Sequence, residues 1–367
     1  MLSAVGDTFS GHGIGFGMRV ANVAGRFAEY RELDAESIAA AFYAGALHGI
    51  GAVRVVVPRD ASPRATEIAG WDDPPAGAAI VAAAQLFPAG TADAIRWHRE
   101  AFDGTGFPDQ LRWNGIPPIA MAINIARAFV AALQTYGENG SPREALFALA
   151  ADTGCIYSLS AMREFRAFLD VETEACIAPY EPRWALPDTG ARTLLTHVCS
   201  EIDARQARTA GRGDRLELIV REILARLRDP QFDPEQVAFA GRLTALARTG
   251  RDGSADDAFT LTRLGLESRA ARALANAHIV STGPAFAPFA PILAALDEWY
   301  DGSGLPGHQA GAAIDPVARV LAVAVAADAL AADNLTAPDA RRRIAAAAGA
   351  RLDPAIVEAY LAGSAKP

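Results

Sequence analysis

Apolar residues recur at intervals of three and four along most of the chain, with polar residues between them. This spacing places the apolar side chains on one face of a helix, so each such stretch predicts a helix with one buried face. In the first half the predicted helices cover residues 18–30, 35–47, 76–86, 91–100 and 117–136. A turn is predicted between the last two, because Gly104 and Gly106 permit a positive φ and Pro108 blocks a helix.

Composition and length support the same fold class. Hydrophobic residues make up 51% of the chain and aromatic residues only 8%. The chain is rich in alanine, which loses no side-chain entropy in a helix. At 367 residues it is also longer than one hydrophobic core usually supports. We therefore predict an all-α protein with two domains.

Matching segments in the two halves indicate an internal duplication. Residues 102–108 (FDGTGFP) are echoed at residues 300–306 (YDGSGLP). Other segments align at similar offsets, namely 15–19 with 211–215, 33–36 with 232–235 and 141–144 with 337–340. Pro179 and Pro182 break the helical pattern between the copies. These observations predict domains at residues 1–178 and 179–367.

The charge of the chain argues against binding to DNA. The formal net charge is -9, so the long-range field repels nucleic acid. Lys366 is the single lysine, and every other basic residue is arginine. Any contact with an anion would therefore come from a guanidinium fork.

Cysteine usage and hydropathy indicate a cytoplasmic protein. Cys155, Cys176 and Cys199 have neither the even number of a disulfide framework nor the C-x-x-C spacing of a zinc site. The N-terminus lacks the basic and apolar regions of a secretory signal. Apolar runs such as residues 320–327 are too short to cross a bilayer, so no membrane partner is expected.

Several of these segments resemble motifs of the HD-GYP phosphodiesterases, which are HD-domain phosphohydrolases. His98-Arg99-Glu100 followed by residues 103–108 resembles the signature H-H-E-x-x-D-G-x-G-Y-P, and residues 47–51 (LHGIG) resemble L-H-D-I-G. The resemblance implies two tandem, all-helical HD-GYP-like domains. Members of that family typically hold two or three iron or manganese ions and hydrolyse cyclic-di-GMP. Clustered divalent ions activate a bridging water and clamp the phosphate oxygens.

Most of the metal ligands that the resemblance implies are replaced in the first copy. Phe16 corresponds to the opening histidine and Gly49 to the bridging aspartate. The other replaced positions are Asp73, Arg99 and Arg127, and the retained ones are His48, His98 and Glu100. His48, Asp73 and His98 could still share one ion. His12 could separately substitute for the missing histidine if the segment to Phe16 were helical, because residues i and i+4 share a face. Two arginines beside a cation would repel it.

The second copy retains fewer of these ligands. The family positions hold Arg212, Ala247-Arg248, Leu296-Asp297-Glu298 and Val325, while His197, His278 and His308 lie outside the motifs. No metal cluster is expected from such side chains. The GYP-like turns survive in both copies, as Asp103, Gly104, Gly106, Phe107 and Pro108 in the first and Asp301, Gly302, Gly304, Leu305 and Pro306 in the second.

Three functions remain open at this point. The leading hypothesis is a catalytically impaired signalling module without a cofactor, which binds a nucleotide such as cyclic-di-GMP, or a signalling protein. In it His48, Asp73, His98, Arg99, Glu100 and Arg127 would line the former active-site pocket. The main alternative is a metal-dependent phosphodiesterase with iron or manganese held by His48, Asp73 and His98. A third is a scaffold whose copies pack together or form a homo-oligomer.

Overall fold

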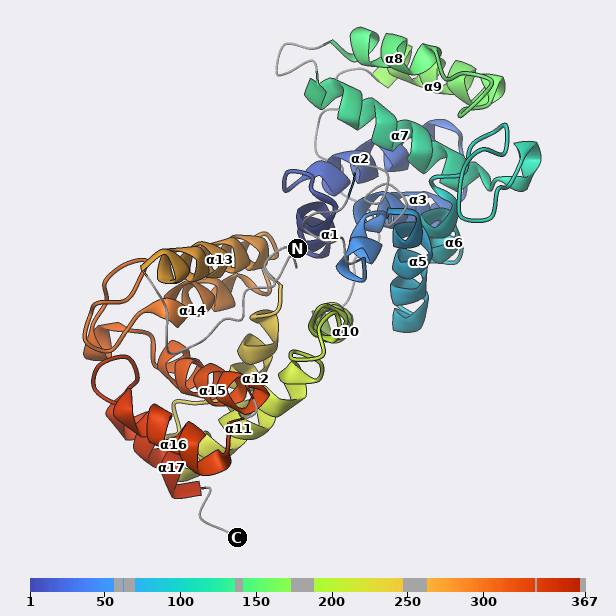
Figure 1. Cartoon of the computed structure of the whole chain (residues 1–367). Helices are drawn as coiled ribbons and strands as arrows, with labels where there is room; N and C mark the ends of the chain where they lie inside the picture. Colours follow the sequence, from blue (N-terminus) through green and yellow to red (C-terminus); the bar gives the residue numbers. More distant parts are fainter. Residues whose placement is uncertain are drawn as a thin grey trace. The chain divides into compact units, whose positions relative to one another are not determined.

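The computed structural model describes residues 1–55, 62, 70–135, 141–172, 188–246, 263–333 and 335–363. Over these residues the chain forms helices and two isolated bridges, and it contains no strand. The prediction of an all-α protein is confirmed. The chain divides into two compact units, Leu2–Leu194 and Leu195–Pro367 (Figure 1). The predicted boundary between residues 178 and 179 lies outside the described residues.

The unit at Leu2–Leu194, here the first unit, contains short helical turns as well as longer helices. Its α-helices are α1 (Leu2–Ser10), α2 (Phe16–Tyr30), α3 (Ala35–Leu47), α5 (Asp73–Ala84), α6 (Thr91–Trp97), α7 (Pro118–Thr135), α8 (Pro142–Ala150) and α9 (Leu159–Glu172). Its 3-10 turns are η1 (Ile50–Val53), η2 (Gly70–Asp72) and η3 (Trp113–Gly115). Helix α10 (Asp188–Ala204) continues into the other unit.

The five helices predicted for the first unit are present, and all but one of them have shifted ends. The prediction for 35–47 matches α3 at both ends. Helix α5 begins three residues before the predicted start, because Pro74 and Pro75 fit the first helical turn. Helix α6 ends at Trp97 rather than at residue 100. Position 136, the predicted last residue of α7, lies outside the described residues.

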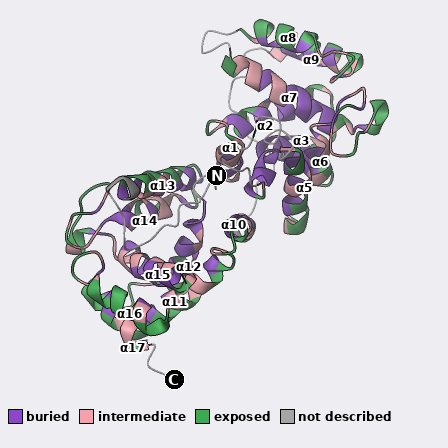
Figure 2. Ribbon diagram, viewed as in Figure 1, coloured by how far each residue is buried: buried purple, intermediate pink, exposed green. Residues whose placement is uncertain are grey.

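The core of the first unit forms around α2, α3 and α7, which Figure 2 shows largely as buried. Phe27 of α2 makes ring contacts with Phe165 and Phe168 of α9, and Phe129 of α7 contacts Phe165 at 5.3 Å. Among the described residues, α7 alone is long and apolar enough to cross a membrane, but half of that stretch is buried within the unit. Its burial is that of a core helix.

The unit at Leu195–Pro367, here the second unit, has its own core between α11, α12, α15, α16 and α17. Its α-helices are α11 (Arg212–Leu227), α12 (Pro234–Leu243), α13 (Arg263–Ser281), α14 (Ala290–Ala294), α15 (Pro316–Ala332), α16 (Ala337–Ala346) and α17 (Pro354–Gly363). Its 3-10 turns are η4 (Ala287–Phe289), η5 (Ala295–Asp297) and η6 (Gly311–Ala313).

The GYP-like turns of the two units share one pattern of hydrogen bonds. The carboxylate of Glu100 accepts hydrogen bonds from the backbone N–H groups of Asp109 and Leu111. The carboxylate of Glu298 accepts the corresponding bonds from Gly307 and Gln309. Both glutamates are buried, so each carboxylate fixes its turn through charge-assisted hydrogen bonds.

Close backbone contacts explain the glycines of these turns. A Cβ at Gly106 would lie 2.1 Å from the backbone N of Ala101, and one at Gly304 would lie 2.1 Å from the backbone N of Trp299. Gly104 and Gly302 have φ of 83° and 84°, a region that favours glycine. The turns are therefore held by backbone shape in both units. The duplication of the two halves stays a prediction.

The buried carboxylate of Glu298 gives a test of this arrangement. In E298Q one acceptor oxygen becomes a donor that faces a backbone N–H, so a charge-assisted bond is lost. We expect the free energy of unfolding to fall by about 2 kcal/mol, measured by urea denaturation. E358Q, at an exposed position of the same unit, should leave it unchanged. Equal effects of the two substitutions would contradict the role given to Glu298.

Candidate functional site

His48 and His98 lie at the C-terminal ends of α3 and α6, with their rings 5.4 Å apart. The Nδ1 of His48 is 2.8 Å from the carbonyl oxygen of Gly45, and the Nδ1 of His98 is 2.7 Å from that of Ile95. A carbonyl oxygen can only accept, so each Nδ1 carries the proton. Each Nε2 is then left with a free lone pair.

Burial and neighbouring charge keep both imidazoles neutral. Burial, together with the guanidinium groups of Arg127 and Arg99, lowers the pKa of His48 to about 3. The pKa of His98 is also well below its usual value, first because of burial and then because of His48 and the same two arginines. These side chains can therefore accept a hydrogen bond or a metal ion but carry no charge near neutral pH.

Asp73 reaches the same place from the first residue of α5. Gly51 permits this approach, since a Cβ there would collide with the backbone of Asp73 and Gly77. Burial raises the pKa of Asp73 to about 6, against the lowering effects of Arg99, the Ala52 N–H and Arg127. The carboxyl group is thus partly protonated near pH 6.

Two arginines complete the group. Burial lowers the pKa of Arg127 to about 10, and repulsion by Arg99 adds to this effect. We call His48, Asp73, His98, Arg99 and Arg127 the His–Arg cluster. Within it four buried atoms have no hydrogen-bond partner among the described residues, namely Asp73 Oδ1, His98 Nε2, Arg99 Nε and Arg127 Nε. Buried polar atoms usually have partners, so this concentration marks a place for a ligand, ion or water.

The positions of the two lost family ligands are filled by the protein itself. Phe16 is fully buried, and the ring of His12 stacks on it at 3.9 Å. His12 is therefore half-buried, and it lies outside any helix because α2 begins at Phe16. At Gly49, a Cβ would lie 3.1 Å from Ser10 Oγ of α1. The side chain of an aspartate at this position would lie against Ser10.

The residues present do not fit a cluster of metal ions. Such a cluster needs several histidines and a bridging carboxylate, whereas Phe16 and Gly49 offer no donor atom. Arg99 and Arg127 place positive charge against His48, Asp73 and His98. Among the residues that the structure describes, no group of three or more His, Cys, Asp and Glu side chains is arranged to hold a metal ion. Glu100 is occupied by its turn.

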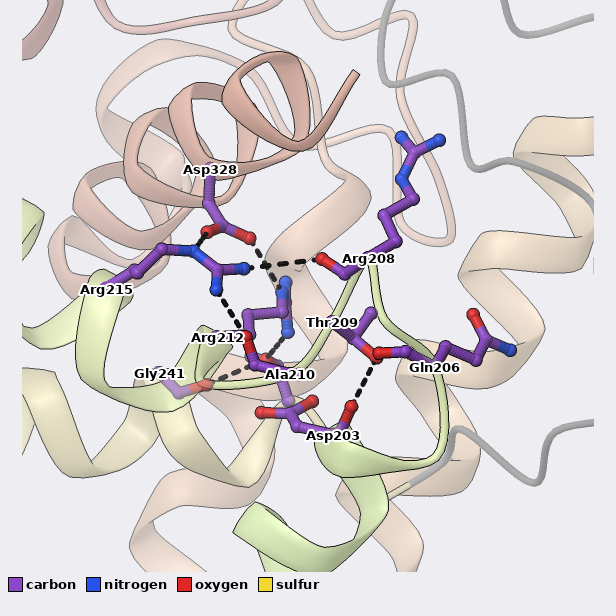
Figure 3. Close-up of polar contacts among 10 residues, drawn as sticks. Asp203, Gln206, Arg208, Thr209, Ala210, Arg212, Arg215, Gly241 and Asp328 are labelled. Atoms are coloured by element: carbon purple, nitrogen blue, oxygen red, sulfur yellow. Dashed lines mark hydrogen bonds and ion pairs between the residues drawn. The ribbon is translucent and has the colours of Figure 1, made fainter. Parts of the chain in front are cut away.

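In the second unit, ion pairs surround Arg212, the residue that the sequence motif aligns with the opening histidine (Figure 3). Arg212, at the position of the opening histidine, donates to Thr244 Oγ1 at 2.7 Å and lies 3.3 Å from Asp328 Oδ2. Arg215 donates to the other oxygen of Asp328 at 2.6 Å. Arg212 and Asp328 are both buried. The centre of this unit is therefore stabilised by a charge pair that needs no ligand.

The remaining motif positions of the second unit agree with this description. Asp297 is paired with Arg269 of α13 at 2.7 Å, and both side chains are largely buried. His278 and His308 are exposed, and His197 lies beside Glu201 one helical turn away. The pair Ala247-Arg248 lies outside the described residues. Sequence analysis missed Asp328, although a lone acid in the apolar stretch 316–332 is a signal for a buried charge.

The neutral histidines predict a pH dependence. Below pH 6.5 the unfolded chain takes up a proton that folded His48 takes up only near pH 3, so the free energy of unfolding falls as the pH falls. Between pH 7 and pH 5 His48 contributes about 2 kcal/mol to this loss. Asp73 acts with the opposite sign, because its folded carboxyl group takes up a proton near pH 6.

Denaturation of wild-type protein and H48N at both pH values measures the contribution of His48. Asparagine can keep the hydrogen bond to Gly45 but does not titrate, so H48N should lose less stability between pH 7 and pH 5. A loss equal to that of the wild type would show that His48 is protonated in the folded protein.

The ion pairs predict unequal effects of one substitution at two aspartates. D328N leaves Arg212 buried without a carboxylate, and we expect it to cost about 3–5 kcal/mol of the free energy of unfolding. D214N breaks the pair of Arg242 with an aspartate that is 76% exposed, and should cost less than about 1 kcal/mol. Chemical denaturation of both variants measures the two costs. Similar costs would mean that burial of Arg212 does not require the carboxylate of Asp328.

Comparison with known proteins shows a domain match in the first unit and a fold match over the whole chain. Residues 9–157 match the family model of the HD domain. A solved structure of a cyclic GMP-AMP-specific phosphodiesterase from V. cholerae is similar at a TM-score of 0.68 and 18% identity, covering 100% of this chain and 96% of that one, which shows the fold. No match was found among the curated proteins. The match to the HD domain therefore covers the segment that holds the His–Arg cluster.

Proposed function

We propose that the first unit binds the phosphate of a nucleotide at the His–Arg cluster and does not hydrolyse it by the metal chemistry of its relatives. The observation that carries this proposal is the set of four buried atoms without hydrogen-bond partners among the described residues, two of which belong to arginines. The chain would then act as a regulatory module that senses a nucleotide.

The charge of the cluster favours an anion. His48 and His98 are neutral, and Asp73 carries at most one negative charge. Arg99 and Arg127 face these three residues with two positive charges that repel each other. A phosphate group would relieve this repulsion and accept bidentate hydrogen bonds from a guanidinium fork.

The kind of nucleotide is suggested by the relative with the same fold. That protein is a cyclic GMP-AMP-specific phosphodiesterase. A binding site derived from such an enzyme would keep affinity for a cyclic dinucleotide after its metal ligands were lost. Cyclic GMP-AMP and cyclic-di-GMP are therefore the first ligands to test.

A single-metal phosphodiesterase is the second candidate, and one observation favours it. The backbone carbonyls of Gly45 and Ile95 hold Nδ1 of both histidines, as outer hydrogen bonds do in many metal sites. Nε2 of each histidine is thereby left as a ligand atom. Iron or manganese held by His48, Asp73 and His98 would supply an activated water, but Arg99 and Arg127 oppose the binding of a cation.

Calorimetric titration with cyclic GMP-AMP and cyclic-di-GMP tests the binding proposal. We expect the wild-type protein to bind at least one of them, and R127M to bind it at least about tenfold more weakly, because hydrogen bonds to a charged group are lost. R163M, which changes an exposed arginine on α9, should bind like the wild type. Absence of binding by the wild type, or equal binding by R127M, would refute the proposal.

Elemental analysis and a hydrolysis assay separate the two candidates. Protein purified with iron and manganese supplied should contain no stoichiometric metal and should leave both cyclic dinucleotides intact. Metal that is lost in H98A and D73A, together with turnover by the wild type, would establish the enzyme instead.

A further inference from the structure

An aromatic pair adjoins the His–Arg cluster and has no role in the proposed phosphate site. Trp71 lies in η2, two residues before Asp73, and its ring stacks on that of Phe107 with centroids 5.5 Å apart and planes inclined by 25°. Trp71 is 47% exposed, although its side chain is large and apolar. An exposed, oriented aromatic ring is a typical platform for a planar ligand.

Arg99 joins the pair to the cluster. Its guanidinium carbon lies 5.8 Å from the centroid of the Phe107 ring. The same guanidinium group lowers the pKa of Asp73 and of His98. Arg99 therefore contacts the aromatic pair and also acts on the cluster. Trp71 and Asp73 lie two residues apart, at the junction of η2 and α5.

We propose that Trp71, supported by Phe107, stacks on the base of the nucleotide whose phosphate is held by Arg99 and Arg127. This inference rests on the proposed function of the cluster. It assigns the ligand class by chemistry: a phosphate supplies the charge that the arginines require, and a planar base covers the exposed indole ring. A sugar phosphate would satisfy only the first requirement.

The choice of Trp71 is specific to its surroundings. Trp113 is even more exposed, at 62%, but it lies in η3 beyond the turn. Phe147 is exposed on α8. Neither has a ring contact with Phe107 or acts on the charges of the cluster among the interactions of the described residues. Of these three exposed aromatic residues, Trp71 is the one whose ring stacks on a ring that also contacts an arginine of the cluster.

Titration of the full chain with 5′-GMP and with ribose 5-phosphate tests the inference, because the two probes share the phosphate and differ in the base. Stacking of a base on an aromatic side chain should make GMP bind about tenfold more tightly. In W71A this preference should disappear, while the affinity for ribose 5-phosphate stays as in the wild type. W71F should recover part of the preference, and W113A should keep all of it.

The outcomes separate the two proposals. If R127M abolishes the binding of both probes but W71A still prefers GMP, the phosphate site stands and the base platform is overturned. If W71A weakens both probes equally, Trp71 supports the fold of the site rather than the base, which also overturns it. If the wild-type protein binds neither probe nor a cyclic dinucleotide, the proposed function fails and the inference fails with it.

Discussion

The need to compensate buried charge determines which side chains lie together at the centre of each unit. An arginine inside a helical domain loses its hydration, and this loss is costly unless a carboxylate or another acceptor replaces the water. In the second unit Arg212 meets this need within the chain, through Asp328 and Thr244. In the first unit Arg99 and Arg127 repel each other beside the partly protonated Asp73. Arginine thus has a carboxylate partner at the centre of the second unit, whereas in the first unit Arg99 Nε and Arg127 Nε have no hydrogen-bond partner among the described residues.

Local packing, as well as the replaced ligands, distinguishes the first unit from the metal-site pattern that the sequence resemblance implies. The close approach of α1 to Gly49 leaves 3.1 Å between Ser10 Oγ and the position of a Cβ. An aspartate at Gly49 would therefore require the side chain of Ser10 to move. Phe16 and His12 likewise fill space with a stacked ring pair. A metal cluster of the HD-GYP type would therefore need several coordinated substitutions in the first unit.

The helices, the turns and the members of the His–Arg cluster can be named from the sequence. The side chains that each of them contacts cannot. The ends of α3 and the turn at residues 103–108 are set by local signals, such as the Asp34 cap and the glycines. The pair of Arg215 and Asp328 joins residues that are 113 positions apart, and no local pattern specifies which acid meets which arginine. The approach of Ser10 in α1 to Gly49 was not predicted for the same reason, because the two residues lie far apart in the sequence.

The two units show why a turn can persist when the chemistry beside it changes. Glu100 and Glu298 use their carboxylates on the backbone of their own turns, so neither depends on the residues at the centre. In contrast, a metal ligand has value only if the other ligands are present, because one histidine cannot retain an ion against nearby guanidinium groups. Loss of one ligand therefore removes the constraint on the rest, while the turn remains under the constraint of its own backbone. This difference leaves Phe107, at the end of a turn held in this way, positioned to support Trp71 whatever the centre binds.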